Sequence, residues 1–152
     1  MKIERLENNP IFIPIIAKWL YDQWGWKHPD GSIDRAKRNL SCPPDSMGLP
    51  IAFVAVDDDT PIGVARLKMH DMDARKDLSP WLASVFVHPG QRGLGIGTAL
   101  CTRVVSEAGM MGFTKLYLFT PDRESFYVRQ GWQTIERAIY RDEEVVIMKI
   151  EP

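Results

Sequence analysis

The first third of the chain shows one alternating segment followed by two segments with helical spacing. Polar and apolar residues alternate over Lys2–Leu6, which predicts a short first strand. Apolar residues then recur every three or four positions between Phe12 and Trp24, which predicts a helix that has Pro14 in its first turn or begins after it. Ser32 is a suitable N-cap for a second, shorter helix. The chain is therefore expected to begin with one strand and two helices.

The middle of the chain contains three apolar segments separated by polar turns. Ile51–Val56 is an uninterrupted apolar run, the pattern of a strand that is covered on both faces. The turn Asp57–Pro61 leads into a returning strand over Ile62–Met69, so these segments predict a hairpin. A polar loop, Asp71–Ser79, precedes a further apolar strand over Trp81–Val87.

The last third alternates strands with helices. The glycine-rich segment Gly93–Gly97 opens an amphipathic helix, and Lys115–Thr120 is the next predicted strand. A short helix over Asp122–Gln130 and a hairpin of residues 132–137 and 145–150 complete the chain.

The predicted order is strand, helix, helix, three strands, helix, strand, helix and two strands. One strand–helix–strand crossover, residues 81–120, then lies inside a sheet of six to seven strands that is otherwise antiparallel. We expect an α+β fold in a single domain, residues 1–152.

Composition and charge exclude several classes of function. The chain has 152 residues and a formal net charge of −1, so no overall positive field attracts nucleic acid or an anionic membrane. No segment is long and apolar enough to span a bilayer, and the charged start, Met1–Pro10, lacks the core of a signal peptide. Cys42 and Cys101 form neither a disulfide framework nor a metal cluster. We expect a cytoplasmic protein without metal, nucleic-acid or membrane partners; a homodimer is left open.

The segment Val85–Thr98 carries the clearest chemical signal. A buried strand runs through a glycine-rich turn directly into a helix, whose first N–H groups lack partners and lie at the positive end of the dipole. Such a turn is a backbone cradle for phosphate. A P-loop would need Gly-Lys-Ser/Thr at its end, where this chain has Gly97-Thr98-Ala99, and the dinucleotide-binding fingerprint would need a third glycine in place of Thr98. Both of these common interpretations are therefore disfavoured.

Two motifs resemble one known family. Arg92–Gly97 (RGLGIG) resembles the Arg-x-x-Gly-x-Gly acetyl-CoA motif of the GNAT superfamily of N-acetyltransferases. Val85-x-Val87-x-Pro89 is similar to that family's fourth strand, and Phe126–Trp132 (FYVRQGW) is similar to its second signature, Phe-Tyr-x-x-x-Gly-Phe/Trp. The resemblance includes specific motifs over residues 81–137. Over residues 1–80 it is limited to the order of the predicted elements.

The resemblance implies a three-layer α/β/α fold with a V-shaped opening between the fourth and fifth strands. It implies that the pantetheine arm of acetyl-CoA pairs with the backbone of Val85 and Val87, and that pyrophosphate rests on the N–H groups of Gly93–Thr98. Arg92 is expected to contribute through its backbone rather than its side chain. The cofactor-binding residues implied in this way are Val85, Phe86, Val87, Arg92, Gly93, Leu94, Gly95, Ile96, Gly97, Thr98, Thr120, Asp122 and Phe126.

Tyr127 resembles the family's general acid. A phenol with a pKa of about 10 stays protonated at neutral pH and can protonate the leaving thiolate. A strand N–H near Phe86 or Val87 can stabilise the oxyanion. The family often has an asparagine at the end of the fifth strand, where this chain has Thr120, and Asp122 either replaces that contact or, in the preferred interpretation, caps the following helix.

The general base and the acceptor are less defined by the sequence. His70, Asp71, Asp73 and His88 are candidates for the base, acting through water. The residues proposed for the acceptor are Trp24, Trp26, Asp71 and Trp81, because aromatic rings and carboxylates can hold a cationic amine.

The resemblance therefore predicts an N-acetyltransferase that moves an acetyl group from acetyl-CoA to a small amine or a peptide amine. The amine is expected to attack directly in a ternary complex, without an acyl-enzyme. The alternative is a non-catalytic acyl-CoA sensor with the same fold.

Overall fold

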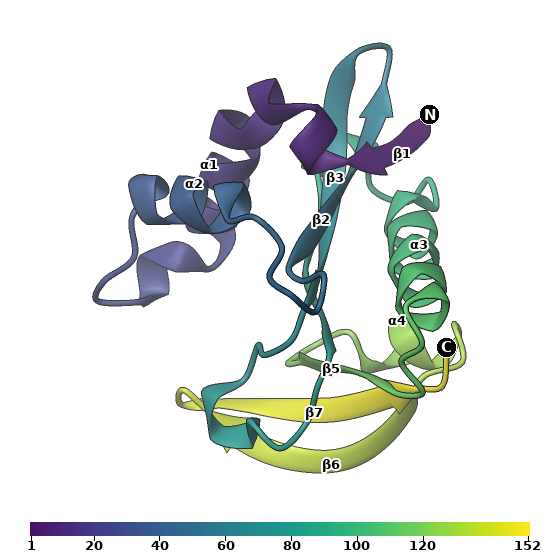
Figure 1. Ribbon diagram of the computed structural model, residues 1–152. Helices are drawn as coiled ribbons and strands as arrows, with labels where there is room; N and C mark the ends of the chain where they lie inside the picture. The colour runs from purple at the N-terminus through teal and green to yellow at the C-terminus, as the bar shows by residue number, and fades with distance from the viewer.

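A seven-stranded sheet with helices on both faces forms the frame of the protein (Figure 1). The computed structural model describes residues 1–152. The strands are β1 (Lys2–Arg5), β2 (Ile51–Asp57), β3 (Thr60–Lys68), β4 (Trp81–Val87), β5 (Leu116–Thr120), β6 (Gln133–Tyr140) and β7 (Glu143–Ile150). The helices are α1 (Ile13–Gln23), α2 (Ile33–Ser41), α3 (Ile96–Met110) and α4 (Glu124–Val128), and short 3₁₀ turns include η1 (Leu6–Asn8), η3 (Gly25–Lys27) and η4 (Asp73–Arg75). The sheet order is β1-β2-β3-β4-β5-β7-β6, and only the β4–β5 pair is parallel. The predicted element order and α+β class are confirmed.

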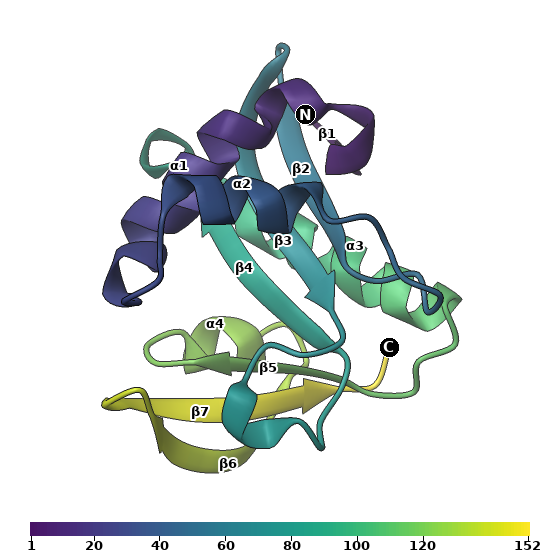
Figure 2. The same cartoon turned by 60° about the vertical axis from the view of Figure 1, so that its left-hand side comes forward.

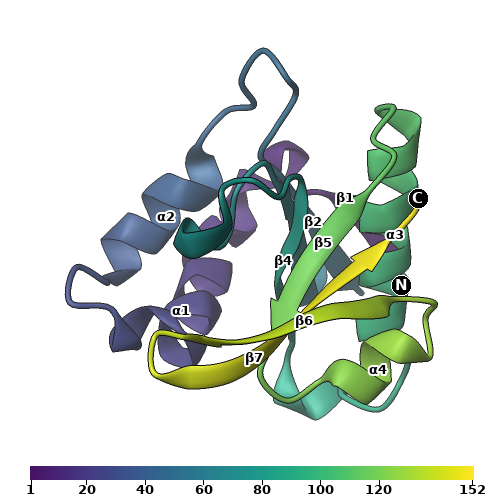
Figure 3. The same cartoon turned by 90° about the horizontal axis from the view of Figure 1, so that it is seen from below.

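The two faces of the sheet are covered by different helices. Helices α1 and α2 lie on one face, and α3 and α4 lie on the other (Figure 1, Figure 3). Strand β2 shows why, because Phe53 and Ala55 pack in the cluster beneath α3 while Val54 and Val56 pack beneath α1. The uninterrupted apolar run therefore belongs to a strand covered on both faces, as predicted. None of the helices combines the length and the apolar composition that crossing a bilayer would require.

Local signals account for most of the boundaries. The Ser32 hydroxyl accepts a hydrogen bond from the Arg35 N–H at 3.0 Å, which confirms it as the cap of α2. Pro14 occupies the first turn of α1, where its missing N–H costs nothing. The last hairpin, Gln133–Ile150, is longer than predicted, and α4 is shorter.

The polar segment Asp71–Ser79 is more ordered than its composition suggests. It contains η4, and its Met72 side chain is buried among the residues between β4 and β7. Arg75 bridges Asp77 at 3.1 Å and Glu136 of β6 at 2.7 Å. A buried methionine and these ion pairs anchor the segment to the C-terminal half of the sheet.

Strands β4 and β5 meet at one end only. Their single registered pair is Trp81 with Tyr117, next to a hydrogen bond from the Tyr117 N–H to the Pro80 carbonyl at 3.0 Å. Beyond this point the two strands diverge toward their carboxyl ends (Figure 2). The divergence leaves one edge of β4 without a strand partner in the middle of the sheet.

Candidate active site

A bulge in β4 accompanies the separation from β5. Val64 of β3 is opposite Phe86 and Arg66 is opposite Ala83, so two residues of β4 face the single Ala65. The first of these two, Ser84, has a φ of 56°, a left-handed conformation that is unusual for a residue with a side chain. A bulge of this kind bends a strand and increases its twist, which turns the end of β4 away from β5.

The backbone of Val87 points into the space between the two strands. The next residue, His88, donates its N–H to the Ile62 carbonyl of β3 at 2.9 Å. Backbone groups of successive residues in a strand point to opposite sides, so the Val87 N–H and carbonyl are directed away from β3. Of the two strand residues considered as oxyanion donors, this geometry favours Val87 over Phe86, which pairs with Val64.

The glycine-rich turn presents a row of unpaired N–H groups. None of the six backbone N–H groups from Gly93 to Thr98 donates a hydrogen bond within the chain, and α3 has no side-chain cap. Gly93 and Gly95 have φ values of 79° and 81°, and nothing lies within 4 Å of where their Cβ atoms would be. The open N–H groups and the positive end of α3 together form a site suited to a phosphate group.

The side chains of this turn point in different directions. Leu94 is 68% exposed, whereas Ile96 is buried in the core beneath α3. The Arg92 Nε donates to the Val87 carbonyl at 2.9 Å, and its guanidinium lies 5.4 Å from the centre of the Phe86 ring. The Arg92 charge is thus held against β4 rather than over the unpaired N–H groups.

Helix α4 lies beside the start of α3. A Cβ at Gly97 would be 3.5 Å from the Phe126 ring and 3.6 Å from a Val87 methyl group, so β4, α3 and α4 meet at this glycine. The Thr120 hydroxyl accepts hydrogen bonds from the N–H groups of Asp122 at 3.4 Å and Arg123 at 3.1 Å. The predicted capping role of Asp122 is therefore wrong. Asp122 is exposed, and no side chain caps α4; the Thr120 hydroxyl instead holds the turn that precedes the helix.

Tyr127 has a buried ring and an accessible hydroxyl. Its ring packs against Phe126 and Trp132, with centroid distances of 5.0 Å and 6.0 Å. The hydroxyl makes no hydrogen bond within the chain, yet the only buried side-chain polar atoms without a partner belong to two arginines, so it must reach solvent. Burial, reinforced by the neighbouring Cys101 thiol, raises the pKa of Tyr127 well above its usual value. The phenol is therefore a protonated donor throughout the physiological range.

Neither cysteine is placed to act as a nucleophile. Cys101 lies on α3 with no exposed surface, and burial raises the pKa of its thiol to about 12. Cys42 is exposed on the loop after α2. Neither thiol is both accessible and close to the unpaired N–H groups of α3.

On the α1 face, two of the predicted acceptor residues are accessible. Trp24 is 37% exposed and meets the Phe86 ring edge-on at 6.5 Å, so it adjoins the bulged half of β4. Trp26, in η3, is 60% exposed and lies 5.8 Å from the Lys27 ammonium group. Trp24 is the better placed of the two to contact an acceptor near β4.

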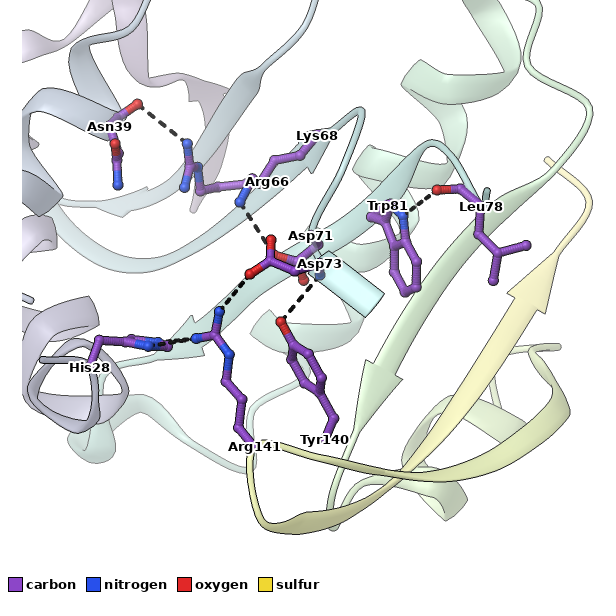
Figure 4. Close-up of polar contacts among 10 residues, drawn as sticks. All are labelled: His28, Asn39, Arg66, Lys68, Asp71, Asp73, Leu78, Trp81, Tyr140 and Arg141. Carbon is purple, nitrogen blue, oxygen red and sulfur yellow. Dashed lines mark hydrogen bonds and ion pairs between the residues drawn. The ribbon is translucent and has the colours of Figure 1, made fainter. Parts of the chain in front are cut away.

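The other two predicted acceptor residues are engaged within the chain. Trp81 has no exposed surface and donates its indole N–H to the Leu78 carbonyl at 2.7 Å (Figure 4). Its assignment to the acceptor site is therefore wrong, because the ring is a core residue that holds the η4 loop in place. Asp71 is paired with Lys68 at 3.2 Å, which leaves little of its charge for an amine.

A bridge that the sequence did not reveal joins three distant segments on the acceptor side. Arg141, at the tip of the β6–β7 hairpin, contacts both His28 after η3 and the Asp73 carboxylate, the latter at 3.0 Å (Figure 4). The Asp73 N–H donates to the Tyr140 hydroxyl at 3.2 Å. Burial and the nearby Arg141 lower the pKa of His28. No local pattern connects residues separated by more than a hundred positions, so only the fold could show this bridge.

The four candidates for the general base differ in whether their side chains are already engaged by other groups. Asp71 and Asp73 are ion-paired, and the His88 ring nitrogen Nδ1 accepts the Gly90 N–H at 3.3 Å. His70 is exposed and forms no polar contact within the chain. Strand β4 carries no acidic side chain that could serve as the base.

Comparisons with known proteins agree with this geometry. The model of the acetyltransferase (GNAT) domain family matches residues 50–134, more than half of the chain, so the chain belongs to this family. It is therefore an acyltransferase whose co-substrate is acetyl-CoA. A sequence comparison with curated proteins finds no match.

Solved structures support the fold. An aminoglycoside 6'-N-acetyltransferase complexed with coenzyme A is 18% identical, with a TM-score of 0.76 over 99% of this chain and 97% of the other. The aminoglycoside 6'-N-acetyltransferase from Enterococcus faecium is 19% identical, with the same TM-score and coverage. An acetyltransferase from Streptococcus agalactiae 2603 is 23% identical, with a TM-score of 0.71 over 99% and 98% of the two chains.

Proposed function

We propose that the protein transfers the acetyl group of acetyl-CoA directly to a primary aliphatic amine. The observation that carries this proposal is the row of six unpaired N–H groups, Gly93–Thr98, beside the unpaired edge of β4. The row would hold the pyrophosphate, and the β4 backbone at Val85 would pair with the pantetheine arm, because the Val87 carbonyl is engaged by Arg92. Thr120 offers acetyl-CoA little surface, because the residue is 5% exposed and its hydroxyl is engaged by the turn before α4.

The residues then have separate tasks. Acetyl-CoA supplies an acetyl group activated as a thioester. The Val87 N–H would stabilise negative charge on the carbonyl oxygen as the amine nitrogen bonds to the carbonyl carbon. When the carbon–sulfur bond breaks, Tyr127 would give its proton to the sulfur, and water would take the proton that the amine loses. Direct transfer is supported by Cys101, since a thiol with no exposed surface cannot become an acyl carrier.

The acceptor is proposed to enter from the α1 face, past Trp24 and the Arg141 bridge. Two of the similar structures are aminoglycoside 6'-N-acetyltransferases, so aminoglycosides belong in the first panel of amines, with polyamines and peptides. The exposed indole of Trp24 can stack against an ammonium group.

The decisive experiment measures transfer and binding separately. Free CoA and acetylated amine are quantified by chromatography, because the exposed Cys42 would consume a thiol reagent. Acetyl-CoA binding is measured by calorimetry. We expect binding together with stoichiometric formation of both products for at least one amine. Binding without turnover across the panel would favour the acyl-CoA sensor, and absence of binding would refute both.

A further inference from the structure

A cavity lies away from the acetyl-CoA region, on the α2 side of the sheet. It has a volume of about 180 Å³ and lies between η1, the end of α2, the following loop and the first residues of β2. Apolar side chains of Leu6, Leu40 and Ala52 line part of it. The volume is below the roughly 300 Å³ of a typical site for a drug-sized ligand, so only a small molecule can enter.

One buried cation faces this cavity. Arg66 of β3 lines it and is 7% exposed, and its Nε is buried without any hydrogen-bond partner. Its only hydrogen bond runs from a terminal nitrogen to the Asn39 carbonyl at 3.3 Å, and the side chain points toward Asn39 rather than toward Asp73 (Figure 4). Burial lowers the pKa of Arg66, in keeping with a charge that lacks sufficient compensation.

The neighbouring carboxylates do not neutralise this cation. Asp71, a carboxylate that raises the pKa of Arg66, is itself paired with Lys68, and Glu7 of the cavity lining is paired with Arg5. A buried charge without a partner is costly, and a guanidinium with free N–H groups matches the two oxygens of a carboxylate. Glu7 and the carbonyl end of α2 oppose a dianion such as phosphate.

We propose that this cavity is a binding site for a small monocarboxylate with a short aliphatic chain. The Arg66 guanidinium binds the carboxylate, and Leu6, Leu40 and Ala52 cover the chain. The site goes beyond the acetyltransferase reaction, since none of its residues belongs to the acetyl-CoA region.

Cys42 provides a reporter, because it lines the same cavity and is the only exposed thiol. Iodoacetate is itself a small monocarboxylate, whereas iodoacetamide is its neutral counterpart. In the wild-type protein, we expect alkylation by iodoacetate to saturate with reagent concentration and alkylation by iodoacetamide to stay linear, both followed by intact mass at constant ionic strength. Butyrate at more than twice its Kd should lower the rate of Cys42 alkylation by iodoacetamide about threefold or more. Phosphate should leave that rate unchanged.

Variants then assign the effect to the guanidinium. Arg66→Met should abolish both saturation by iodoacetate and protection by butyrate. Arg103→Met is the matched control, since Arg103 also has a buried, unpartnered Nε but does not line the cavity. If Arg66→Met fails to fold, the wild-type kinetics still decide. Linear kinetics with iodoacetate and no protection by butyrate would overturn the proposal, and equal protection by phosphate would overturn the choice of a monocarboxylate.

Discussion

The Arg92 Nε donates a hydrogen bond to the Val87 carbonyl at 2.9 Å, so the arginine of the glycine-rich motif is attached to the strand that precedes it. The same guanidinium covers the Phe86 ring. The side chain therefore fixes the turn against β4 and leaves the anion to the backbone N–H groups of the turn.

Replacing this arginine should have a modest effect on binding. In Arg92→Met the long apolar stem still covers Phe86, but the hydrogen bond to Val87 is lost. We expect the Kd for acetyl-CoA to rise by about threefold, close to 0.7 kcal/mol, when measured by calorimetry. A loss of a hundredfold would mean that the guanidinium itself binds the pyrophosphate, contrary to its observed direction.

Thr120 should stabilise the turn that carries α4. Thr120→Val has the same shape but leaves the N–H groups of Asp122 and Arg123 without an acceptor. The free energy of unfolding in urea should fall by about 1 kcal/mol. Thr120→Ser retains the hydroxyl and should stay close to wild type. Equal stability of the valine and serine variants would show that water replaces the hydroxyl at no cost.

Stability should decrease in alkali through Cys101. The folded-state pKa of this thiol is raised to about 12, above the roughly 8.5 of an unfolded cysteine, so folding favours the protonated form. This contribution is complete below the unfolded pKa and is lost as pH rises toward the folded value. Between about pH 9 and 10 the free energy of unfolding should fall by up to about 1.4 kcal/mol per pH unit.

Cys101→Ala removes the thiol and tests that slope. The variant should be less stable at pH 7, because a buried sulfur is lost. Its free energy of unfolding should, however, fall less steeply with pH in alkali, by the contribution of one titrating proton. Urea unfolding at several pH values measures both quantities. An unchanged slope would assign the alkaline loss to other groups.

Tyr127→Phe should lower kcat without weakening acetyl-CoA binding. The hydroxyl acts on the leaving sulfur, which becomes basic only in the transition state. We expect kcat to fall about tenfold to a hundredfold, the lower part of the range for general acids, because water can partly substitute. Tyr117→Phe is the matched control, since Tyr117 is equally buried but belongs to a different core cluster. A wild-type kcat in Tyr127→Phe would make the residue part of the scaffold.

The sequence was most informative where function depends on consecutive residues. The apolar strand, the glycines and the helix of Val85–Thr98 are local, and their order already predicted a row of unpaired N–H groups. The Ser84 bulge left no signal, because the left-handed backbone of this serine accompanies its pairing with β3 and is not marked by a glycine.

Other features failed to appear in the sequence for related reasons. Thr120 and Asp122 are both good acceptors within one turn, so spacing alone could not show that Thr120 holds the turn before α4 and that no side chain caps the helix. Trp81 was proposed as an acceptor contact because it is aromatic, yet it packs in a core cluster with Met72 and Tyr117. The contact of His28 with Arg141 joins residues 113 positions apart and depends on the whole fold.

Calorimetric titration of acetyl-CoA into Gly97→Glu tests the central claim most directly. Gly97 lies among the unpaired N–H groups, and a Cβ there meets Phe126 and Val87 at ordinary contact distances, so the fold should survive. Gly109→Glu, at the exposed end of the same helix, controls for the added charge. We predict that Gly97→Glu weakens binding by at least about tenfold, or 1.4 kcal/mol, and that Gly109→Glu binds like wild type. Wild-type affinity in a folded Gly97→Glu protein would contradict the account.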